Sequence, residues 1–236
     1  MKIKYVLFDL DGTLLPMNQE EFTKAYFGLL AKKLAPLGYE PNKLIESIWS
    51  GTKAMIKNAG ERTNEVVFWN TFASIYGEDS KKDLLYFDEF YNIDFDKVQP
   101  SCGYNPKAQE VIALLKSKNI TLALATNPIF PKTATTKRIA WAGLNKNDFS
   151  HITTYENSNF CKPNLKYYEH ILNILGAKAE ECLMIGNDIA EDMVTENLGI
   201  KTFLLTDCLI NKTGEDISKY NHGTFDDLIE FINKNC

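Results

Sequence analysis

Short apolar runs that do not alternate with polar residues constrain the fold of this chain more than any other feature. The first covers residues 5–8 and stops at Asp9, and similar runs follow at 120–125, 152–155, 182–185 and 200–205. A strand that is buried on both faces of a sheet reads as a continuous apolar run, and this is typical of parallel sheets covered by helices. The runs therefore predict the strands of a parallel sheet.

Helical patterns lie between most of these runs, at residues 106–117, 133–142, 165–175 and 188–197. A last helix is predicted over 224–234, where Phe225, Leu228, Ile229 and Ile232 have helical spacing. Strands that alternate with helices indicate an α/β fold. We therefore expect a Rossmann-like core built on a parallel sheet.

The segment between the first and second runs is different, because it shows helical patterns and no strand pattern. The predicted helices cover 19–37, 42–59, 65–76 and 81–90. Since the first run needs the later β/α units to complete a sheet, this block is expected to be an insertion in one core domain. The prediction is a Rossmann-like core made of residues 1–15 and 100–236, with an all-helical cap domain at 16–99.

Composition and charge exclude several classes of partner. The chain has 236 residues with 26 Lys+Arg and 31 Asp+Glu, a net charge of −5, and its charges are scattered, which argues against a nucleic-acid partner. No run of about 18 apolar residues predicts a membrane span. The first residues lack a signal-peptide pattern and the cysteines lack metal or disulfide spacing, so a cytoplasmic protein that acts on a small molecule is expected.

Two carboxylates follow the first apolar run, at Asp9 and Asp11, and Gly12 allows a tight turn after them. One carboxylate can attack an electrophile while the other donates and then accepts a proton. By itself the segment 9–13 also fits an ordinary Asp-Gly turn at the end of a strand.

Residues that suit phosphate follow the next two runs. Thr126 and Asn127 come after residues 120–125, where a hydroxyl and backbone N–H groups can hold phosphate oxygens. Lys162 comes after residues 152–155 and carries a compact positive charge. The alternatives are loop residues before Pro128 and a solvated lysine.

Asp188 and Asp192 follow the run at 182–185. Mg²⁺ is commonly held by one or two carboxylates, waters and substrate phosphate, so oxygen ligands in this place suit it. If a helix begins near Asp188, these two residues share one face of its first turn. The alternative is that they cap that helix.

The combination is more informative than any single motif. Because parallel strands deliver their carboxyl ends to one edge of a sheet, these residues are expected to converge there. Together they would provide what phosphoryl transfer to a carboxylate requires: a nucleophile, an acid/base, a metal site and donors for phosphate oxygens.

In these motifs the sequence resembles the haloacid dehalogenase-like hydrolase superfamily. The matches are DLDGT at 9–13, ATN at 125–127, KP at 162–163, and GND at 186–188 followed by Asp192. The helical block directly after the first motif resembles the cap of the type-I subgroup, which includes phosphoglycolate phosphatase-like and β-phosphoglucomutase-like enzymes.

The resemblance implies a role for each matching residue. Asp9 would be the nucleophile and Asp11 the acid/base, while Thr126, with Asn127 beside it, and Lys162 would hold the phosphate. Mg²⁺ would be bound by Asp9, Asp11 and Asp188, with Asp192 supporting the site. The presence of Asp11 favours phosphate esters over haloacids.

We therefore expect a Mg²⁺-dependent phosphatase that hydrolyses a small phosphorylated metabolite through an aspartyl-phosphate intermediate. A sugar-phosphate mutase of the same fold and a non-catalytic phospho-ligand-binding module are the alternatives. Neither the metabolite nor the oligomeric state follows from the sequence.

Substrate choice is expected to lie in the cap, but its residues do not identify a substrate. Its most basic stretch holds Lys53, Lys57 and Arg62. The alternatives are contact with an anionic substrate and, favoured by the i, i+4 spacing of Lys53 and Lys57, a solvated helix face. Its aromatic residues are expected to form the core of the cap rather than a stacking pocket; they are Trp49, Phe68, Trp69, Phe72 and Tyr76.

Overall fold

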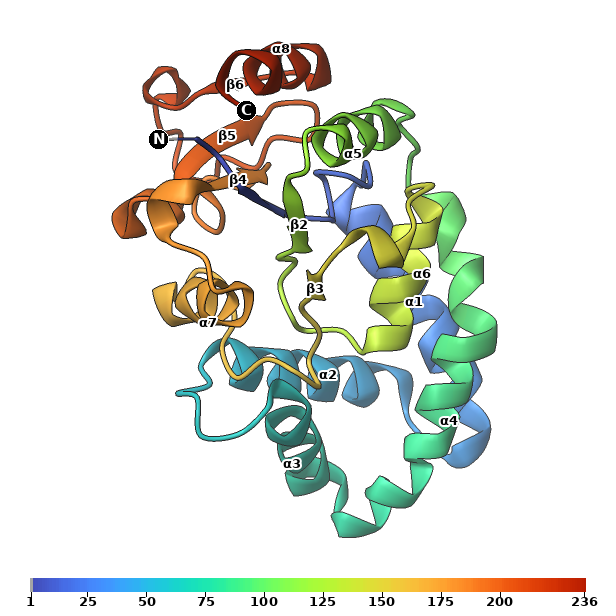
Figure 1. Cartoon of the computed structure of the whole chain (residues 1–236). Coiled ribbons are helices and arrows are strands. Elements are labelled where there is room, and N and C mark those ends of the chain that lie inside the picture. The colour runs from blue at the N-terminus through green and yellow to red at the C-terminus, as the bar shows by residue number, and fades with distance from the viewer. Residues whose placement is uncertain (1) are drawn as a thin grey trace.

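The computed structural model describes residues 2–236 and contains a six-stranded sheet in the order β3-β2-β1-β4-β5-β6 (Figure 1). Every strand pairs in parallel with its neighbours. The strands are β1 (Tyr5–Phe8), β2 (Thr121–Leu124), β3 (His151–Ile152), β4 (Cys182–Gly186), β5 (Lys201–Leu205) and β6 (His222–Gly223). The predicted α/β fold with a Rossmann-like parallel sheet is confirmed.

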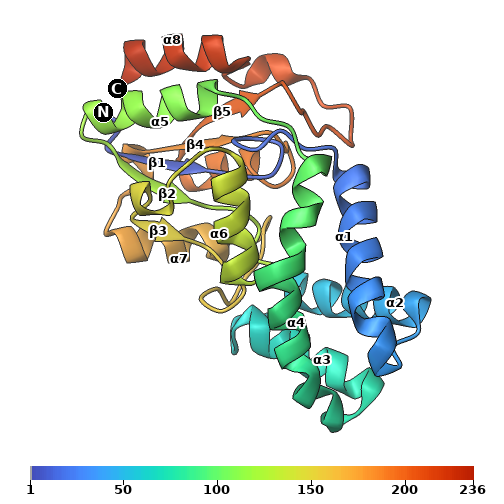
Figure 2. The ribbon, with the colours of Figure 1, turned by 90° about the vertical axis from the view of Figure 1, so that its right-hand side faces the viewer.

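The central strands are buried on both faces, which explains their continuous apolar sequence. On β1, Val6 and Phe8 belong to one apolar cluster and Leu7 to another, because successive side chains point to opposite faces. Four helices accompany the sheet: α5 (Lys107–Ser117), α6 (Lys132–Trp141), α7 (Leu165–Leu175) and α8 (Phe225–Asn235). Figure 2 shows α5 and α8 over one face and α7 under the other.

Residues between β1 and β2 form helices and no strand, as the sequence predicts for this block. They include α1 (Gln19–Leu34), α2 (Pro41–Ile56), α3 (Asn64–Tyr76) and α4 (Leu84–Glu89), followed by short π- and 3-10-helical turns through Ser101. The block, here called the helical insert (residues 16–99), extends from the edge of the sheet at which β1 ends (Figure 2). Met17 and Cys102 pair in an isolated antiparallel bridge, so the chain leaves and returns to the sheet region at one place.

The expected strand at 152–155 is wrong in its extent, since β3 covers only His151 and Ile152. The Thr153 N–H still donates to the Leu124 carbonyl of β2 at 3.0 Å, and after it side chains bond the backbone instead. The Thr154 N–H donates to Asn157 Oδ1 at 2.8 Å, and Asn157 Nδ2 donates to the Ile152 carbonyl at 2.9 Å. These bonds close a turn where a longer strand would continue. The short strand β6 was not predicted.

The expected helix at 188–197 is also wrong. Asp188 forms an isolated bridge with Ile210, residues 189–192 form turns, and a 3-10 helix covers Met193–Leu198. Asp188 Oδ1 accepts the backbone N–H groups of Ala190 at 2.8 Å and Glu191 at 3.0 Å. An aspartate that bonds the backbone just ahead of it competes with helix formation. In residues 2–236, no helix has the length and apolarity that crossing a membrane requires.

Candidate active site

Asp9 occupies the first position after β1, and its backbone N–H donates to the Ile185 carbonyl of β4 at 2.9 Å. This bond extends the parallel ladder by one residue and fixes where the carboxylate starts. The residue is 7% exposed, so its carboxylate is almost enclosed by protein. Lys162 Nζ donates to Asp9 Oδ1 at 2.8 Å, and Thr13 Oγ1 lies 3.1 Å from Asp9 Oδ2.

Lys162 joins Asp9 to Asp192, because its ammonium also donates to Asp192 Oδ1 at 2.6 Å. Both Lys162 and Asp192 are 1% exposed. Burial alone would lower the pKa of Lys162, but the carboxylates of Asp192 and Asp9 outweigh it and hold this pKa well above its usual value. The lysine is therefore a fixed positive charge beside Asp9.

Asp192 is held by a second contact and by a tight fit. Its Oδ2 accepts the Asp188 backbone N–H at 3.1 Å. A Cβ atom at Gly186 would lie 2.1 Å from Asp192 Oδ2, so only glycine leaves room for this carboxylate. Burial raises the pKa of Asp192, and the Lys162 ammonium opposes that shift. The glycine in the 186–188 motif thus serves the packing of Asp192.

Asp11 makes different contacts from Asp9. Its Oδ2 forms an ion pair with the Arg138 guanidinium, which comes from α6 and is 1% exposed. Its Oδ1 is buried without a hydrogen-bond partner among the described residues. Burial raises the pKa of Asp11, while the Arg138 charge opposes the shift. A carboxyl with a raised pKa and one free oxygen is suited to carry a proton.

Thr126 and Asn127 follow β2, in the loop next to Asp9. The Thr126 carbonyl accepts hydrogen bonds from Thr153 Oγ1 and the Tyr167 hydroxyl, both at 2.7 Å, which fixes the loop backbone. Asn127 Nδ2 donates to both carboxylate oxygens of Glu191, at 3.1 and 3.2 Å. Asn127 Oδ1 is buried and has no partner in the described part of the chain.

Asn187 and Thr13 connect the first and fourth motifs. Thr13 Oγ1 lies 3.0 Å from Asn187 Oδ1, so this hydroxyl reaches Asn187 and Asp9 alike. Asn187 Nδ2 donates to the Cys208 carbonyl at 2.6 Å, which orients the amide so that its oxygen faces Thr13. Gly12 has φ +89°, and a Cβ there would lie 2.3 Å from Asn187 Nδ2, so both conformation and space require glycine.

Hydrogen bonds thus bring Asp9, Lys162 and Asp192 together. Asp11 is paired with Arg138 instead, and Asp188 bonds the backbone of its own turn. Asp188 Oδ1 therefore accepts backbone N–H groups as a capping residue would, but no helix begins at Asp188.

Sequence reasoning gave no role to several residues of this region, namely Thr13, Arg138, Asn187 and Glu191. Thr13 and Asn187 stand inside the motifs DLDGT and GND, so their position was a usable signal. Arg138 had no such signal, because it lies 127 positions from Asp11 along the chain. Burial raises the pKa of Glu191, and the charges of Asp188 and Asp9 add to that shift.

The donor atoms around Asp9 fit a hard divalent cation. In residues 2–236 no cluster of three or more His, Cys, Asp or Glu side chains could hold a metal by itself. Mg²⁺ does not require one, since it is usually bound by one or two carboxylates with waters and substrate phosphate. The Asp9 carboxylate and the Asn187 amide oxygen both contact Thr13 Oγ1, and Asp188, the residue after Asn187, adds a further carboxylate; all are hard oxygen donors.

Comparison with known proteins agrees with these motifs. Residues 3–195 match the family model of the haloacid dehalogenase-like hydrolases. A glyceraldehyde 3-phosphate phosphatase from Methanothermobacter thermautotrophicus is 22% identical, with 92% of each chain covered. The pyrophosphatase PpaX from Halalkalibacterium halodurans is 29% identical over 86% of this chain and 83% of its own.

Solved structures show the same fold at low identity. A HAD phosphatase from Thermococcus onnurineus matches with a TM-score of 0.59 and 19% identity, covering 98% of both chains. A 2-haloacid dehalogenase from Pseudomonas syringae pv. Tomato matches with a TM-score of 0.65 and 18% identity, covering 98% of this chain and 99% of its own. Because the family model covers most of the chain, this protein is a hydrolase that belongs to the haloacid dehalogenase-like family.

Proposed function

We propose that the protein is a Mg²⁺-dependent phosphatase that hydrolyses a small phosphorylated metabolite through an aspartyl-phosphate on Asp9. The observation that carries the proposal is the buried set of Asp9, Lys162 and Asp192 at the end of β1. It presents a carboxylate nucleophile beside a fixed positive charge, which is what attack on an anionic phosphate requires.

The first half-reaction transfers the phosphoryl group to the protein. A carboxylate oxygen of Asp9 attacks phosphorus, and the bond between phosphorus and the leaving oxygen breaks. Asp11 gives its proton to that leaving oxygen, a role that its raised pKa favours. Lys162 and the Thr126–Asn127 loop hold the phosphate oxygens while charge develops on them.

The second half-reaction regenerates Asp9. Asp11, now deprotonated, takes a proton from water, and the resulting hydroxide attacks phosphorus. The bond between phosphorus and the Asp9 oxygen breaks, which releases inorganic phosphate. Arg138 orients the Asp11 carboxylate through both steps. A bound Mg²⁺, held by Asp9, Asp11 and Asp188, would neutralise the charge of the phosphate next to the attacking carboxylate.

The helical insert is proposed to act as a cap over this site, with the rest of the chain as the core. A contact between the insert and the core supports this assignment. Asn64 at the start of α3 has its Nδ2 3.2 Å from the Pro128 carbonyl, next to the loop of Thr126 and Asn127. A small phosphorylated substrate is supported by the names of the two relatives, a glyceraldehyde 3-phosphate phosphatase and a pyrophosphatase. By the family resemblance, Asp11 favours phosphate esters over haloacids.

The proposal is tested by phosphate release from a panel of phosphate esters in the presence of Mg²⁺ or excess EDTA. We expect release by the parent protein with Mg²⁺, and loss of it in EDTA. Asp9→Asn should lower kcat by about 10³-fold or more, because the nucleophile is gone. Asp207→Asn, at an exposed aspartate after β5, is the matched control and should keep full activity. Undiminished release from Asp9→Asn would contradict the proposal.

A further inference from the structure

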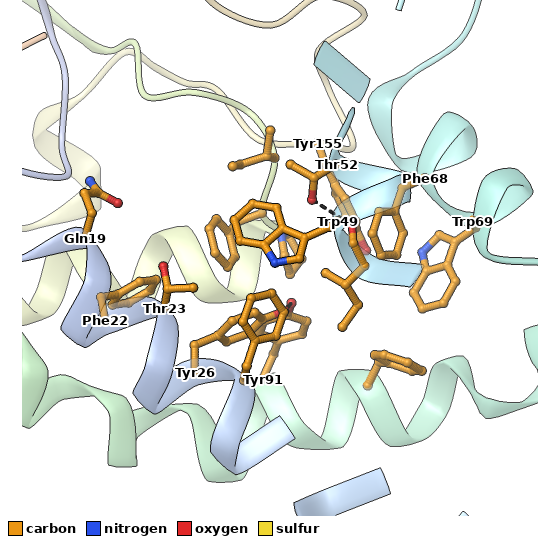
Figure 3. Close-up of a pocket in the computed structure, with 16 residues that line it drawn as sticks. Gln19, Phe22, Thr23, Tyr26, Trp49, Thr52, Phe68, Trp69, Tyr91 and Tyr155 are labelled. Atoms are coloured by element: carbon orange, nitrogen blue, oxygen red, sulfur yellow. Dashed lines mark hydrogen bonds between the residues drawn. The ribbon is translucent and has the colours of Figure 1, made fainter. Parts of the chain in front are cut away.

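A cavity of about 120 Å³ lies between the helical insert and the core, and its walls are mostly aromatic (Figure 3). Helix α1 contributes Phe22 and Tyr26, α2 contributes Trp49, and α3 contributes Phe68 and Trp69. The core closes the cavity with Phe130, in the loop that follows Asn127. The rings at Trp49, Phe68 and Trp69 thus line a cavity, contrary to the expectation that they only form the core of the cap.

The walls of this cavity carry no charge. Among its described lining residues there is no Lys, Arg, His, Asp or Glu, and the basic stretch of Lys53, Lys57 and Arg62 takes no part in it. Its hydroxyl groups are largely satisfied by protein. The Tyr26 and Tyr91 hydroxyls bond each other at 2.7 Å, and Thr52 Oγ1 donates to the Ile48 carbonyl at 2.9 Å.

Two tryptophans of the wall differ in exposure. Trp69 is 8% exposed, and its Nε1 is buried beside Tyr155, another lining residue. Trp49 lies at the opposite extreme, because this large aromatic side chain is 51% exposed. An exposed indole on a cavity wall is suited to contact a ligand.

The cavity adjoins the residues that the proposed reaction uses for proton transfer. The Arg138 guanidinium, which pairs with Asp11, lies 4.4 Å from the ring centre of Phe130. One face of the Phe130 ring therefore packs on the partner of the acid/base, while Phe130 also lines the cavity. Asp11 protonates the leaving oxygen in that reaction, so the group attached to that oxygen departs on this side of the site.

We propose, on the basis of the phosphatase function above, that this cavity binds the leaving group of the substrate and selects phosphate monoesters of an apolar alcohol about the size of one aromatic ring. An apolar cavity of about 150 Å³ binds benzene, so one ring or a compact aliphatic group of similar size suits the space. A carboxylate or a second phosphate is disfavoured, because burying an anion without a cation carries a large cost.

The selectivity is tested by comparing kcat/KM for benzyl phosphate, phosphoglycolate and pyrophosphate with Mg²⁺. Benzyl phosphate and phosphoglycolate are both esters of primary alcohols, so their comparison reports mainly on binding of the leaving group. We expect the parent protein to prefer benzyl phosphate tenfold or more over each of the other two. A kcat/KM for phosphoglycolate or pyrophosphate that equals or exceeds that for benzyl phosphate would overturn the proposal and leave the phosphatase function standing.

A charge placed in the wall provides the matched variant. Thr23 lines the cavity on α1 and is partly exposed, so Thr23→Arg adds a cation at little cost to folding. It should reduce the preference for benzyl phosphate over phosphoglycolate at least tenfold. Thr71→Arg, at a partly exposed threonine of α3 outside the cavity, should leave the preference unchanged. Equal effects of the two variants would contradict the assignment.

A binding measurement separates this inference from the proposed function. Benzylphosphonate has a carbon–phosphorus bond in place of the ester and is not hydrolysed by the proposed mechanism. We expect it to quench the tryptophan fluorescence of the parent protein and to bind at least tenfold more weakly to Thr23→Arg. If no ester is hydrolysed but benzylphosphonate binds in this pattern, the phosphatase proposal fails and the cavity assignment holds. Absence of saturable quenching would overturn the cavity assignment itself.

Discussion

Arg138 is the residue on which the position of Asp11 most depends. Its guanidinium is enclosed between the Asp11 carboxylate and the Phe130 ring, and it also lies 3.4 Å from Thr135 Oγ1. Removing one partner of a buried ion pair leaves an uncompensated buried charge. That charge destabilises the folded state by more than the intact pair stabilises it.

Arg138→Met is therefore expected to lower the free energy of unfolding by about 3 kcal/mol. Urea denaturation followed by circular dichroism measures this change. Lys116→Met, which breaks the exposed pair of Lys116 with Asp148, is the control and should cost less than about 1 kcal/mol. Similar losses of unfolding free energy in the two variants would contradict the prediction that the buried Arg138 pair matters more for stability than the exposed pair.

Cys161 precedes Lys162, yet its thiol is not activated. Burial raises the pKa of Cys161 to about 12, and the nearby charge of Glu191 adds to the shift. Because the thiolate is the reactive form, a raised pKa leaves almost none of it at pH 8. We expect iodoacetamide at pH 8 to modify the half-buried Cys208 and to spare Cys161 until urea unfolds the chain, as read by peptide mass spectrometry. Equal rates at the two thiols in the folded protein would contradict this.

At the scale of elements, Asn64 is what docks the start of α3 on the core. It is fully buried, and its Nδ2 lies 3.2 Å from the Pro128 carbonyl and 3.3 Å from the Phe160 carbonyl. Its own backbone N–H donates to the Ser158 carbonyl at 2.8 Å. The helical insert is thus tied to the loops that carry Asn127 and Lys162.

Asn64→Leu should lower the free energy of unfolding by about 1–3 kcal/mol, because buried carbonyl groups lose their donor. It should also speed amide hydrogen exchange in α3, since local opening of the docked end becomes easier. Asn70→Leu, at an exposed position of the same helix, should change neither quantity appreciably. Unchanged exchange in the Asn64 variant would mean that other contacts hold α3 in place.

The elements also show what the sequence predicts and what it does not. Apolar runs predicted β1, β2, β4 and β5 correctly, because a strand that is buried on both faces is recognisable from its apolar composition alone. The turn at 189–192 was missed and β3 was predicted too long, because side chains of Asp188 and Asn157 bond the local backbone there. The Asp11–Arg138 pair was also missed, since it depends on how α6 packs against the β1 loop.

At the scale of the whole molecule, the parallel order of the sheet is what assembles the candidate site. β1 lies between β2 and β4, so the loops after all three strands meet around Asp9. The sequence predicted this convergence from the strand pattern and the motifs. It did not predict which side chains pair, because Lys162 meets Asp9 across 153 positions of the chain.

This assembly concentrates negative charge, and that leads to a prediction about the stability of the entire chain. Asp9, Glu191 and Asp192 crowd around the Lys162 ammonium, and Asp188 adds another carboxylate nearby. A divalent cation that binds the folded state and not the unfolded state stabilises it by about 2.7 kcal/mol at a concentration of 100 Kd. For a chain of this size, each kcal/mol shifts Tm by roughly 2–4 °C.

We therefore expect saturating Mg²⁺ to raise the Tm of the parent protein by about 5 °C or more, as followed by scanning fluorimetry. NaCl at the same ionic strength should give a much smaller rise, since screening alone does not occupy a site. Asp9→Asn should lose most of the Mg²⁺ effect, because it removes a carboxylate ligand and one of the crowded charges. Asp207→Asn should keep the effect. An equal rise with NaCl, or an undiminished rise in Asp9→Asn, would place any Mg²⁺ binding away from the end of β1.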